Sequence, residues 1–400
     1  MPNRLAGRLS AVSPSITLAI NARAQELRAK GVNVISFGAG EPDFDTPEYI
    51  REAGRKAIAE GRTRYTPVSG IPELRKAIAE HSTQTRGVAA KPENVTVTVG
   101  AKGALFNLAL AAFEEGDEVV IPTPCWVSYP EQVRLAGATP VFVESTLESG
   151  WKVSAEALRA ALTPRTKAVI LCSPSNPTGA AYTADELLAL ADALRGHDCW
   201  IVTDEIYAGL VYDGFVQRSI VSVAPDLAPR VVIIDGVSKT YAMTGWRVGW
   251  SIAPVALAKA MDTVQGQGAT STATFAQWGA LEALRSPPTE LERMRVLFQE
   301  RRNRLIHGLR ALPGVRCGMP EGAFYAFCDV RAWLGKRTPM DVVLNTDGDI
   351  AQWLLDAAHI AVVPGSAFMA PGHLRLSYAV GLATIDDALA RLAGAVSSLA

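Results

Sequence analysis

Short apolar runs alternate with amphipathic segments through the middle of the chain, and this alternation most constrains the fold. Helical patterns separate the runs, among them 103–113, 155–162 and 184–194. Strands that alternate with helices of this length are typical of a mostly parallel sheet covered on both faces. We therefore predict an α/β fold with a seven-stranded sheet. Its strands are expected at 95–99, 119–121, 141–143, 168–172, 200–203, 231–234 and 248–252.

The pattern changes after about Pro287, which indicates a second and smaller α+β domain. A long charged helix is expected at 289–312, followed by a strand at 322–329 and a helix near 348–359. Two short strands at 361–363 and 374–378 and a final helix from 385 complete it. A further helix at 16–27 indicates mature structure rather than a transit peptide. We predict an N-terminal segment 1–44 packing with the small domain, a large domain 45–287 and a small domain 288–400.

Composition excludes several classes of function. The 400 residues are 48% hydrophobic and carry a net charge of −1, so a large core is expected and no broad field attracts nucleic acid or an anionic membrane. No apolar run approaches the roughly 18 residues of a membrane span. The five cysteines and five histidines are scattered without metal-ligand spacing, so neither a disulfide framework nor a metal site is expected. We expect a cytoplasmic protein without nucleic-acid or membrane partners.

Ligands of an open parallel sheet bind beyond the carboxyl ends of its strands, so the residues that follow each predicted strand are the candidates. Gly100, Ala101 and Lys102 open a helix, whose free backbone N–H groups suit a phosphate. Trp126 follows the second strand and could stack on a flat ring. The string SPSNPTG presents the amide of Asn176. Taken singly, each motif could also be a structural turn or a core aromatic, although SPSNPTG is unusually long for a turn alone.

Asp204 and Tyr207 end another predicted strand. A carboxylate buried there is costly without a cationic partner, and a protonated pyridine nitrogen would be one. Tyr207, three residues on, could reach a ring hydroxyl.

Lys239 follows the apolar run 231–234 and the turn signal Asp235-Gly236. Desolvation favours the neutral amine, which can form a Schiff base with an aldehyde. The alternative is a solvated surface lysine, which an apolar and aromatic helical turn after Lys239 disfavours. Arg247 lies eight residues further on (247 − 239 = 8). Arg375 either meets a carboxylate bidentately or is a surface arginine on an edge strand.

Together these residues call for one ligand with five features. It has a phosphate for Gly100–Lys102 and Arg247, a flat ring for Trp126, and an acidic hydroxyl for Asn176 and Tyr207. It also has a basic ring nitrogen for Asp204 and an aldehyde for Lys239. Pyridoxal 5′-phosphate has all five.

Over nearly its whole length the chain resembles the class I aminotransferases of pyridoxal-phosphate fold type I. The matching strings are GAGEPDFDTP, RYTPVSGIPELR, PCWVSYPE, SPSNPTGA, DEIY, SKTYAMTGWRVG, GAFY and RLSYA. It is most similar to bacterial aspartate aminotransferases of the thermophile-type subgroup, some of which also use prephenate.

The resemblance implies a role for each matching residue. Lys239 would be the Schiff-base lysine and proton shuttle, and Asp204 would pair with the pyridine nitrogen. Asn176 and Tyr207 would bind the ring oxygen, and Trp126 would stack on the ring. Arg375, with Gly40 and Asn176, would bind the substrate α-carboxylate. Tyr65 would bind the cofactor phosphate in a neighbouring subunit. A homodimer with shared active sites follows from the last of these.

Two departures from the family pattern matter. A phosphate-binding serine often precedes the lysine by three residues, where this chain has Gly236. Arg247, the Gly100–Lys102 backbone and Ser238 would then hold more of the anion. The stretch 264–274 also lacks the arginine that binds the distal carboxylate in enteric and animal enzymes. In the thermophile-type subgroup a lysine and N-terminal hydroxyls do this, and Lys102, Ser15 and Thr17 match those positions.

The resemblance thus implies transfer of the amino group from L-aspartate to 2-oxoglutarate. A prephenate, aromatic or alanine aminotransferase and a carbon–sulfur β-lyase remain alternatives on the same fold. A non-catalytic regulator is disfavoured because the chain has no basic patch for DNA. A nicotinamide oxidoreductase is disfavoured because no GxGxxG follows a strand.

Overall fold

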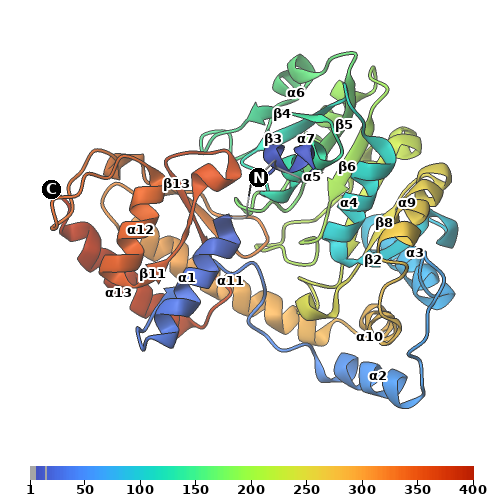
Figure 1. Cartoon of the computed structure of the whole chain (residues 1–400), viewed down its shortest axis with the longest axis horizontal. Helices are drawn as coiled ribbons and strands as arrows, with labels where there is room; N and C mark the ends of the chain where they lie inside the picture. The colour runs from blue at the N-terminus through green and yellow to red at the C-terminus, as the bar shows by residue number, and fades with distance from the viewer. Residues whose placement is uncertain (1–5, 14–15) are drawn as a thin grey trace.

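The computed structural model describes residues 6–13 and 16–400, which form a larger and a smaller part (Figure 1). The larger part, on the right of Figure 1, contains the seven-stranded sheet. The smaller part, on the left, contains the C-terminal helices. The long helix α11 (Thr289–Arg310) lies along the smaller part and reaches towards the larger one. In the described part of the chain, no helix is long and apolar enough to cross a membrane.

The seven-stranded sheet confirms the predicted fold class. β8 runs antiparallel to both of its neighbours, and every other neighbouring pair is parallel. The strand cores match the predicted runs, with ends that differ by up to two residues. The spatial order is β2 (Val95–Val99), β8 (Val248–Ile252), β7 (Val231–Gly236), β6 (Trp200–Asp204), β5 (Thr166–Cys172), β3 (Glu118–Thr123) and β4 (Thr139–Glu144).

Apolar side chains cover both faces of this sheet, because successive residues of a strand point to opposite sides. In β6, Ile201 packs into one core and Val202 into the other. The core of Val202 is covered by α4 (Gly100–Ala112), α5 (Ser128–Leu135) and α9 (Val255–Gly268). The opposite core is covered by α2 (Glu48–Ala59), α3 (Pro72–Arg86), α6 (Ala155–Ala161), α7 (Ala184–Leu194), α8 (Ile220–Val223) and α10 (Thr274–Arg285).

The smaller part contains a four-stranded antiparallel sheet and a two-stranded parallel one. The first has the order β12 (Val363–Pro364), β13 (His373–Ser377), β10 (Tyr325–Asp329) and β9 (Arg316–Cys317). The second pairs β1 (Ile35–Ser36) with β11 (Ile360–Ala361). The single strand expected at 361–363 is therefore wrong, because Val362 separates two strands of different sheets. Helices α1 (Ile16–Ala29), α12 (Asp347–Ala358) and α13 (Leu382–Ser397) complete this part.

The pairing of β1 with β11 places the N-terminal segment on the smaller part. Ile35 and Phe37 share a buried cluster with residues of α11, β10 and α13. The boundaries after residues 44 and 287 stay a prediction, which this separate core supports.

The sequence placed two element ends incorrectly around β7 and α4. Asp235-Gly236 does not end β7 as a turn, because Asp235 pairs with Trp250 and Gly236 with Gly249 of β8. Helix α4 begins at Gly100 rather than 103. Gly249 is involved in both differences, since it pairs with Gly236 and also lies against the start of α4. A Cβ at Gly249 would lie 2.3 Å from the backbone nitrogen of Ala101. The helix start therefore lies directly on the sheet.

We predict that Gly249→Ala destabilises the protein by about 3 kcal/mol or more, because the added methyl group meets backbone atoms that cannot rotate away. The midpoint of thermal unfolding should fall by roughly 4 °C or more, since the entropy of unfolding of a chain of this length is large. Gly196→Ala is the control, since a Cβ at Gly196 has no atom within 4 Å. Equal midpoints for the two variants would contradict the close contact of α4 with the sheet.

Candidate active site

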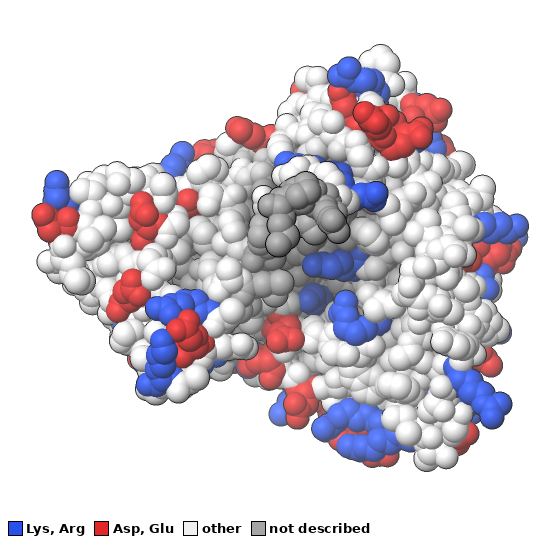
Figure 2. Space-filling model, viewed as in Figure 1, with Lys and Arg blue, Asp and Glu red and all other residues white. Residues whose placement is uncertain are grey.

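A cavity of about 430 Å³ lies beyond the carboxyl ends of β3, β5, β6 and β7. Lys and Arg side chains gather around a hollow in the middle of the face in Figure 2. The cavity is lined by eleven of the predicted site residues: Gly40, Ala101, Lys102, Trp126, Asn176, Asp204, Tyr207, Ser238, Lys239, Arg247 and Arg375. Gly100 lies directly behind Arg247. Tyr65 is 89% exposed and outside this lining. Ser15 and the side chain of Thr17 lie outside the described residues.

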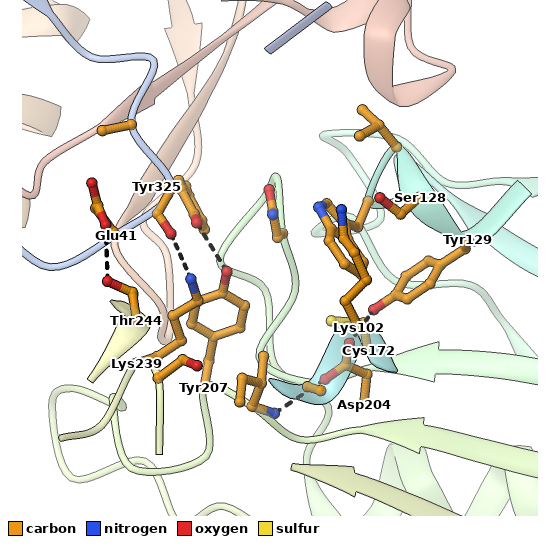
Figure 3. A pocket seen from close by; sticks show the side chains of 18 of the residues that line it. Glu41, Lys102, Ser128, Tyr129, Cys172, Asp204, Tyr207, Lys239, Thr244 and Tyr325 are labelled. Atoms are coloured by element: carbon orange, nitrogen blue, oxygen red, sulfur yellow. Dashed lines mark hydrogen bonds between the residues drawn. The ribbon is translucent and has the colours of Figure 1, made fainter. Parts of the chain in front are cut away.

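Lys239 follows β7 on a turn that is not helical, contrary to expectation. Ala242 and Arg247 both have positive φ values, 50° and 56°, which interrupt a right-handed helix. The Lys239 Nζ donates a hydrogen bond to the carbonyl oxygen of Gly40 at 2.6 Å (Figure 3). Burial, with the charges of Arg247 and Arg375, lowers the pKa of Lys239 to about 8, against the opposing charge of Glu41. A neutral amine is thus accessible near neutral pH.

Asp204 is buried, but its partners here are neutral rather than cationic. Tyr129 Oη donates to Asp204 Oδ2 at 2.6 Å, and the backbone N–H of Ile206 donates to Oδ1 at 3.2 Å. Burial raises the pKa of Asp204 to about 6, although both hydrogen bonds lower it. A cation beside this carboxylate would therefore be strongly favoured. The sequence reasoning missed Tyr129, whose only signal was its place in the matching string PCWVSYPE, three residues after Trp126.

The Tyr207 hydroxyl lies 2.9 Å from that of Tyr325, which the sequence reasoning also missed. Burial raises the pKa values of both phenols, so both remain protonated and can donate to an oxygen in the cavity. Tyr325 was visible only as the last letter of the matching string GAFY.

Arg375 is 2% exposed on β13, between β12 and β10, so the alternative of a surface arginine on an edge strand is wrong. Its Nη1 donates to Asn176 Oδ1 at 3.0 Å and its Nη2 to the carbonyl oxygen of Gly38 at 2.9 Å. Its Nε has no hydrogen-bond partner among the described residues. Burial lowers the pKa of Arg375, and its partners among the described residues are an amide and a carbonyl rather than a carboxylate. Such a cation is suited to bind a substrate carboxylate.

Arg247 and the start of α4 form the opposite end of the cavity. A Cβ at Gly100 would lie 2.6 Å from Arg247 Nη2, so glycine lets the guanidinium approach the helix end. Free N–H groups, a helix dipole and an arginine together suit a phosphate. A serine at position 236 is excluded sterically, since its Cβ would lie 2.9 Å from Gly249 Cα. Ser238 is the buried hydroxyl that lines the cavity instead.

Lys102 leans over the ring of Trp126, with its Nζ 4.8 Å from the ring centroid. Burial, followed by the charge of Arg247, lowers the pKa of Lys102. Glu41, which the sequence reasoning did not single out, accepts a hydrogen bond from Thr244 Oγ1 at 2.9 Å and joins the N-terminal segment to the Lys239 turn.

The residues present fit pyridoxal 5′-phosphate. The Gly100–Arg247 cradle, the buried carboxylate and the partly deprotonated lysine supply the three kinds of contact that its phosphate, ring nitrogen and aldehyde require. In the described part of the chain, no group of three His, Cys, Asp or Glu side chains could hold a metal ion.

This fold and site define a pyridoxal-phosphate-dependent transferase, and comparison with known proteins agrees. The chain belongs to the family described as aminotransferase class I and II, whose model matches residues 32–392. A probable aspartate/prephenate aminotransferase of Rhizobium leguminosarum bv. phaseoli is 46% identical over 97% of both chains. The aspartate aminotransferase of Geobacillus stearothermophilus is 45% identical over 97% of this chain and 98% of the relative.

Solved structures show the same likeness. The aspartate aminotransferase of Rhizobium meliloti superposes with a TM-score of 0.96 at 43% identity, covering 99% of this chain and all of the other. That of Thermus thermophilus with maleate has a TM-score of 0.92 at 44% identity, covering 98% and 99%. The chain is a pyridoxal-phosphate-dependent aminotransferase.

We predict that Asp204→Asn leaves the cofactor-free protein at least as stable as the wild type at pH 8. The folded-state pKa lies above the ordinary value, so the ionised carboxylate costs stability above about pH 6, and this cost disappears as the pH falls towards 4. The midpoint of thermal unfolding, measured from pH 4 to 8, should favour the variant only at the upper end. A difference that does not change with pH would contradict the burial effect.

Proposed function

We propose that the enzyme transfers the amino group of L-aspartate to 2-oxoglutarate, giving oxaloacetate and L-glutamate. The observation that carries this proposal is that Lys102 lines the same cavity as Arg375, in addition to Lys239 and Arg247. A substrate with carboxylates at both ends would meet Arg375 with one and Lys102 with the other. Relatives named aspartate aminotransferase support the same assignment.

Lys239 would carry the proton transfers. Its lowered pKa makes Nζ a base near neutral pH, and the carbonyl of Gly40 orients it. When bound, pyridoxal 5′-phosphate supplies the electron sink that makes the α-proton of an amino acid acidic. Asp204, oriented by Tyr129, would hold the protonated ring nitrogen. The first product would leave before the second substrate binds, as in ping-pong kinetics.

The other cavity residues would bind and orient. Arg247, Ser238 and the Gly100–Lys102 backbone would hold the phosphate, and Trp126 would stack on the ring. Tyr207 would donate to the ring oxygen with Asn176, and Tyr325 would orient the Tyr207 hydroxyl. Arg375, fixed by Asn176 and Gly38, would hold the α-carboxylate of the substrate. The bound carboxylate would exclude water from the buried Arg375 guanidinium. Together with Lys102, Ser15 and Thr17 would bind the distal carboxylate of the substrate.

Prephenate is the second candidate substrate, because relatives named aspartate/prephenate aminotransferase match the chain at 45–46% identity. Prephenate also carries two carboxylates, so Lys102 would serve both substrates.

We predict that Lys102→Ala lowers kcat/KM for aspartate about a hundredfold, as expected for loss of a charged contact. For alanine, which has no distal carboxylate, the change should stay within about threefold. Lys76→Ala is the control, because Lys76 is an exposed lysine on α3 remote from the cavity lining. A coupled assay with both amino donors measures this, and equal losses on the two would contradict a distal-carboxylate role for Lys102.

A homodimer with shared active sites is also part of the proposal. Tyr65 supports it, because its side chain is exposed and lies outside the cavity lining of its own chain. We place the enzyme in the cytoplasm, which its five free cysteines support.

We predict that co-refolding Tyr65→Ala chains with Lys239→Ala chains restores activity that neither variant has alone at limiting cofactor. If Tyr65 serves the neighbouring subunit, one site of each mixed dimer is intact, so equal mixing should give about a quarter of wild-type activity. Each variant refolded alone is the control. No recovery in mixed dimers of confirmed composition would show that Tyr65 does not act across subunits.

A further inference from the structure

Arg86 binds two buried carboxylates directly behind the cofactor site. It is the last residue of α3, and it lies outside the cavity lining. Its Nη1 donates to Glu205 Oε2 at 2.9 Å, and its Nη2 forms a short contact with Asp235 Oδ2. The three side chains are 7%, 3% and 6% exposed. Neither the fold nor the proton transfers described above account for a cation at this position.

The two carboxylates are adjacent in sequence to the groups that do the chemistry. Glu205 directly follows Asp204, so its side chain points away from the cavity while that of Asp204 points into it. Asp235 is four residues before Lys239 (239 − 235 = 4) and lies on β7. A backbone hydrogen bond from Glu205 N to the Ile234 oxygen, 2.8 Å long, joins the ends of β6 and β7. Arg86 therefore links the two chain segments that carry Asp204 and Lys239.

Each carboxylate is also fixed by a second donor. Thr203 Oγ1 donates to Glu205 Oε1 at 3.0 Å, and the backbone N–H of Gly236 donates to Asp235 Oδ1 at 2.7 Å. The guanidinium is the only described cation paired with either group. Removing it would leave two buried charges uncompensated, which is strongly unfavourable.

The charge of this cluster reaches Asp204. After burial and its hydrogen bonds, the negative charges of Asp235 and Glu205 raise the pKa of Asp204 further. Burial raises the pKa of Glu205, and the positive charge of Arg86 opposes this rise, so Arg86 favours the ionised form of Glu205.

We propose that Arg86 is a positioning residue of the cofactor site, acting through Glu205 and Asp235. It holds the Asp204 carboxylate and the Lys239 turn in place and balances the negative charge behind Asp204. The proposal requires only that the site binds pyridoxal 5′-phosphate, whichever amino acid the enzyme uses.

The test compares Arg86→Met with Arg75→Met, which removes another arginine of α3. Among the described residues, Arg75 donates hydrogen bonds only to the carbonyl oxygens of Val95 and Pro92. We expect Arg86→Met to raise the dissociation constant of pyridoxal 5′-phosphate, measured by fluorescence on cofactor-free protein, about tenfold or more. With saturating cofactor, kcat should fall by a similar factor while KM for aspartate stays within about threefold. Arg75→Met should change none of the three.

A variant with one fewer buried carboxylate distinguishes a charge-balancing role of Arg86 from a role in packing alone. Asp235→Asn combined with Arg86→Met leaves one uncompensated carboxylate instead of two, so it should recover much of the lost affinity. A double variant no better than Arg86→Met overturns the charge-balancing role. Arg86→Met with wild-type affinity and kcat but a lower unfolding midpoint overturns the whole proposal, because Arg86 would then be only structural.

If Arg86→Met does not fold, Arg86→Lys tests the proposal instead. Lysine keeps the charge but lacks the planar fork that reaches both carboxylates, so affinity and kcat should fall less than in Arg86→Met but measurably. Wild-type affinity and kcat in Arg86→Lys would then overturn the proposal. The affinity measurement does not depend on the substrate, so failure of the aspartate assignment would show separately, as activity on another amino donor with cofactor affinity intact.

Discussion

The close contact between the start of α4 and strand β8 is the constraint on which the site depends. Gly249 has no side chain, so the backbone of Ala101 rests on the sheet, and Gly236 and Gly249 pair across β7 and β8. This contact brings the free N–H groups of α4 beside Arg247, which immediately precedes β8. It also explains the absence of a serine at position 236, because the same close approach leaves no room for one. The end of the cavity that we propose binds the phosphate is thus a result of sheet packing.

The electrostatics of the cavity follow from burial. Lys239 and Asp204 are displaced from their ordinary pKa values in opposite directions, each towards its neutral form. Arg375 cannot change its protonation and keeps a charge without a carboxylate partner in the described chain. A cofactor with an aldehyde and a basic ring nitrogen would provide partners for Lys239 and Asp204, and a substrate carboxylate would provide one for Arg375. The cavity is therefore complementary to cofactor and substrate together.

Much of this arrangement could be predicted from the sequence, because strand cores are β-branched runs and parallel strand ends meet at one edge. Val95–Val99 and Val248–Ile252 were predicted with their correct bounds. Contacts between distant segments could not be predicted: the bond of Tyr129 to Asp204, the bond of Tyr325 to Tyr207, and the link of Arg86 to Asp235 join residues 75 to 149 positions apart. The turn at Asp235-Gly236 was wrong because pairing with β8 overrides the local preference.

The two side chains that we propose as ligands of the substrate carboxylates are held with unequal rigidity. Arg375 lies in the interior of a sheet and is fixed by Asn176 and the Gly38 carbonyl, whereas Lys102 only leans on the face of Trp126. A substitution at Arg375 would disturb the core of the smaller part, but one near Lys102 would alter little beyond the cavity wall. Descendants of this chain could therefore acquire new side-chain preferences at the Lys102 end while every substrate remained an α-amino acid. Catalytic diversification would be confined to one wall of the cavity.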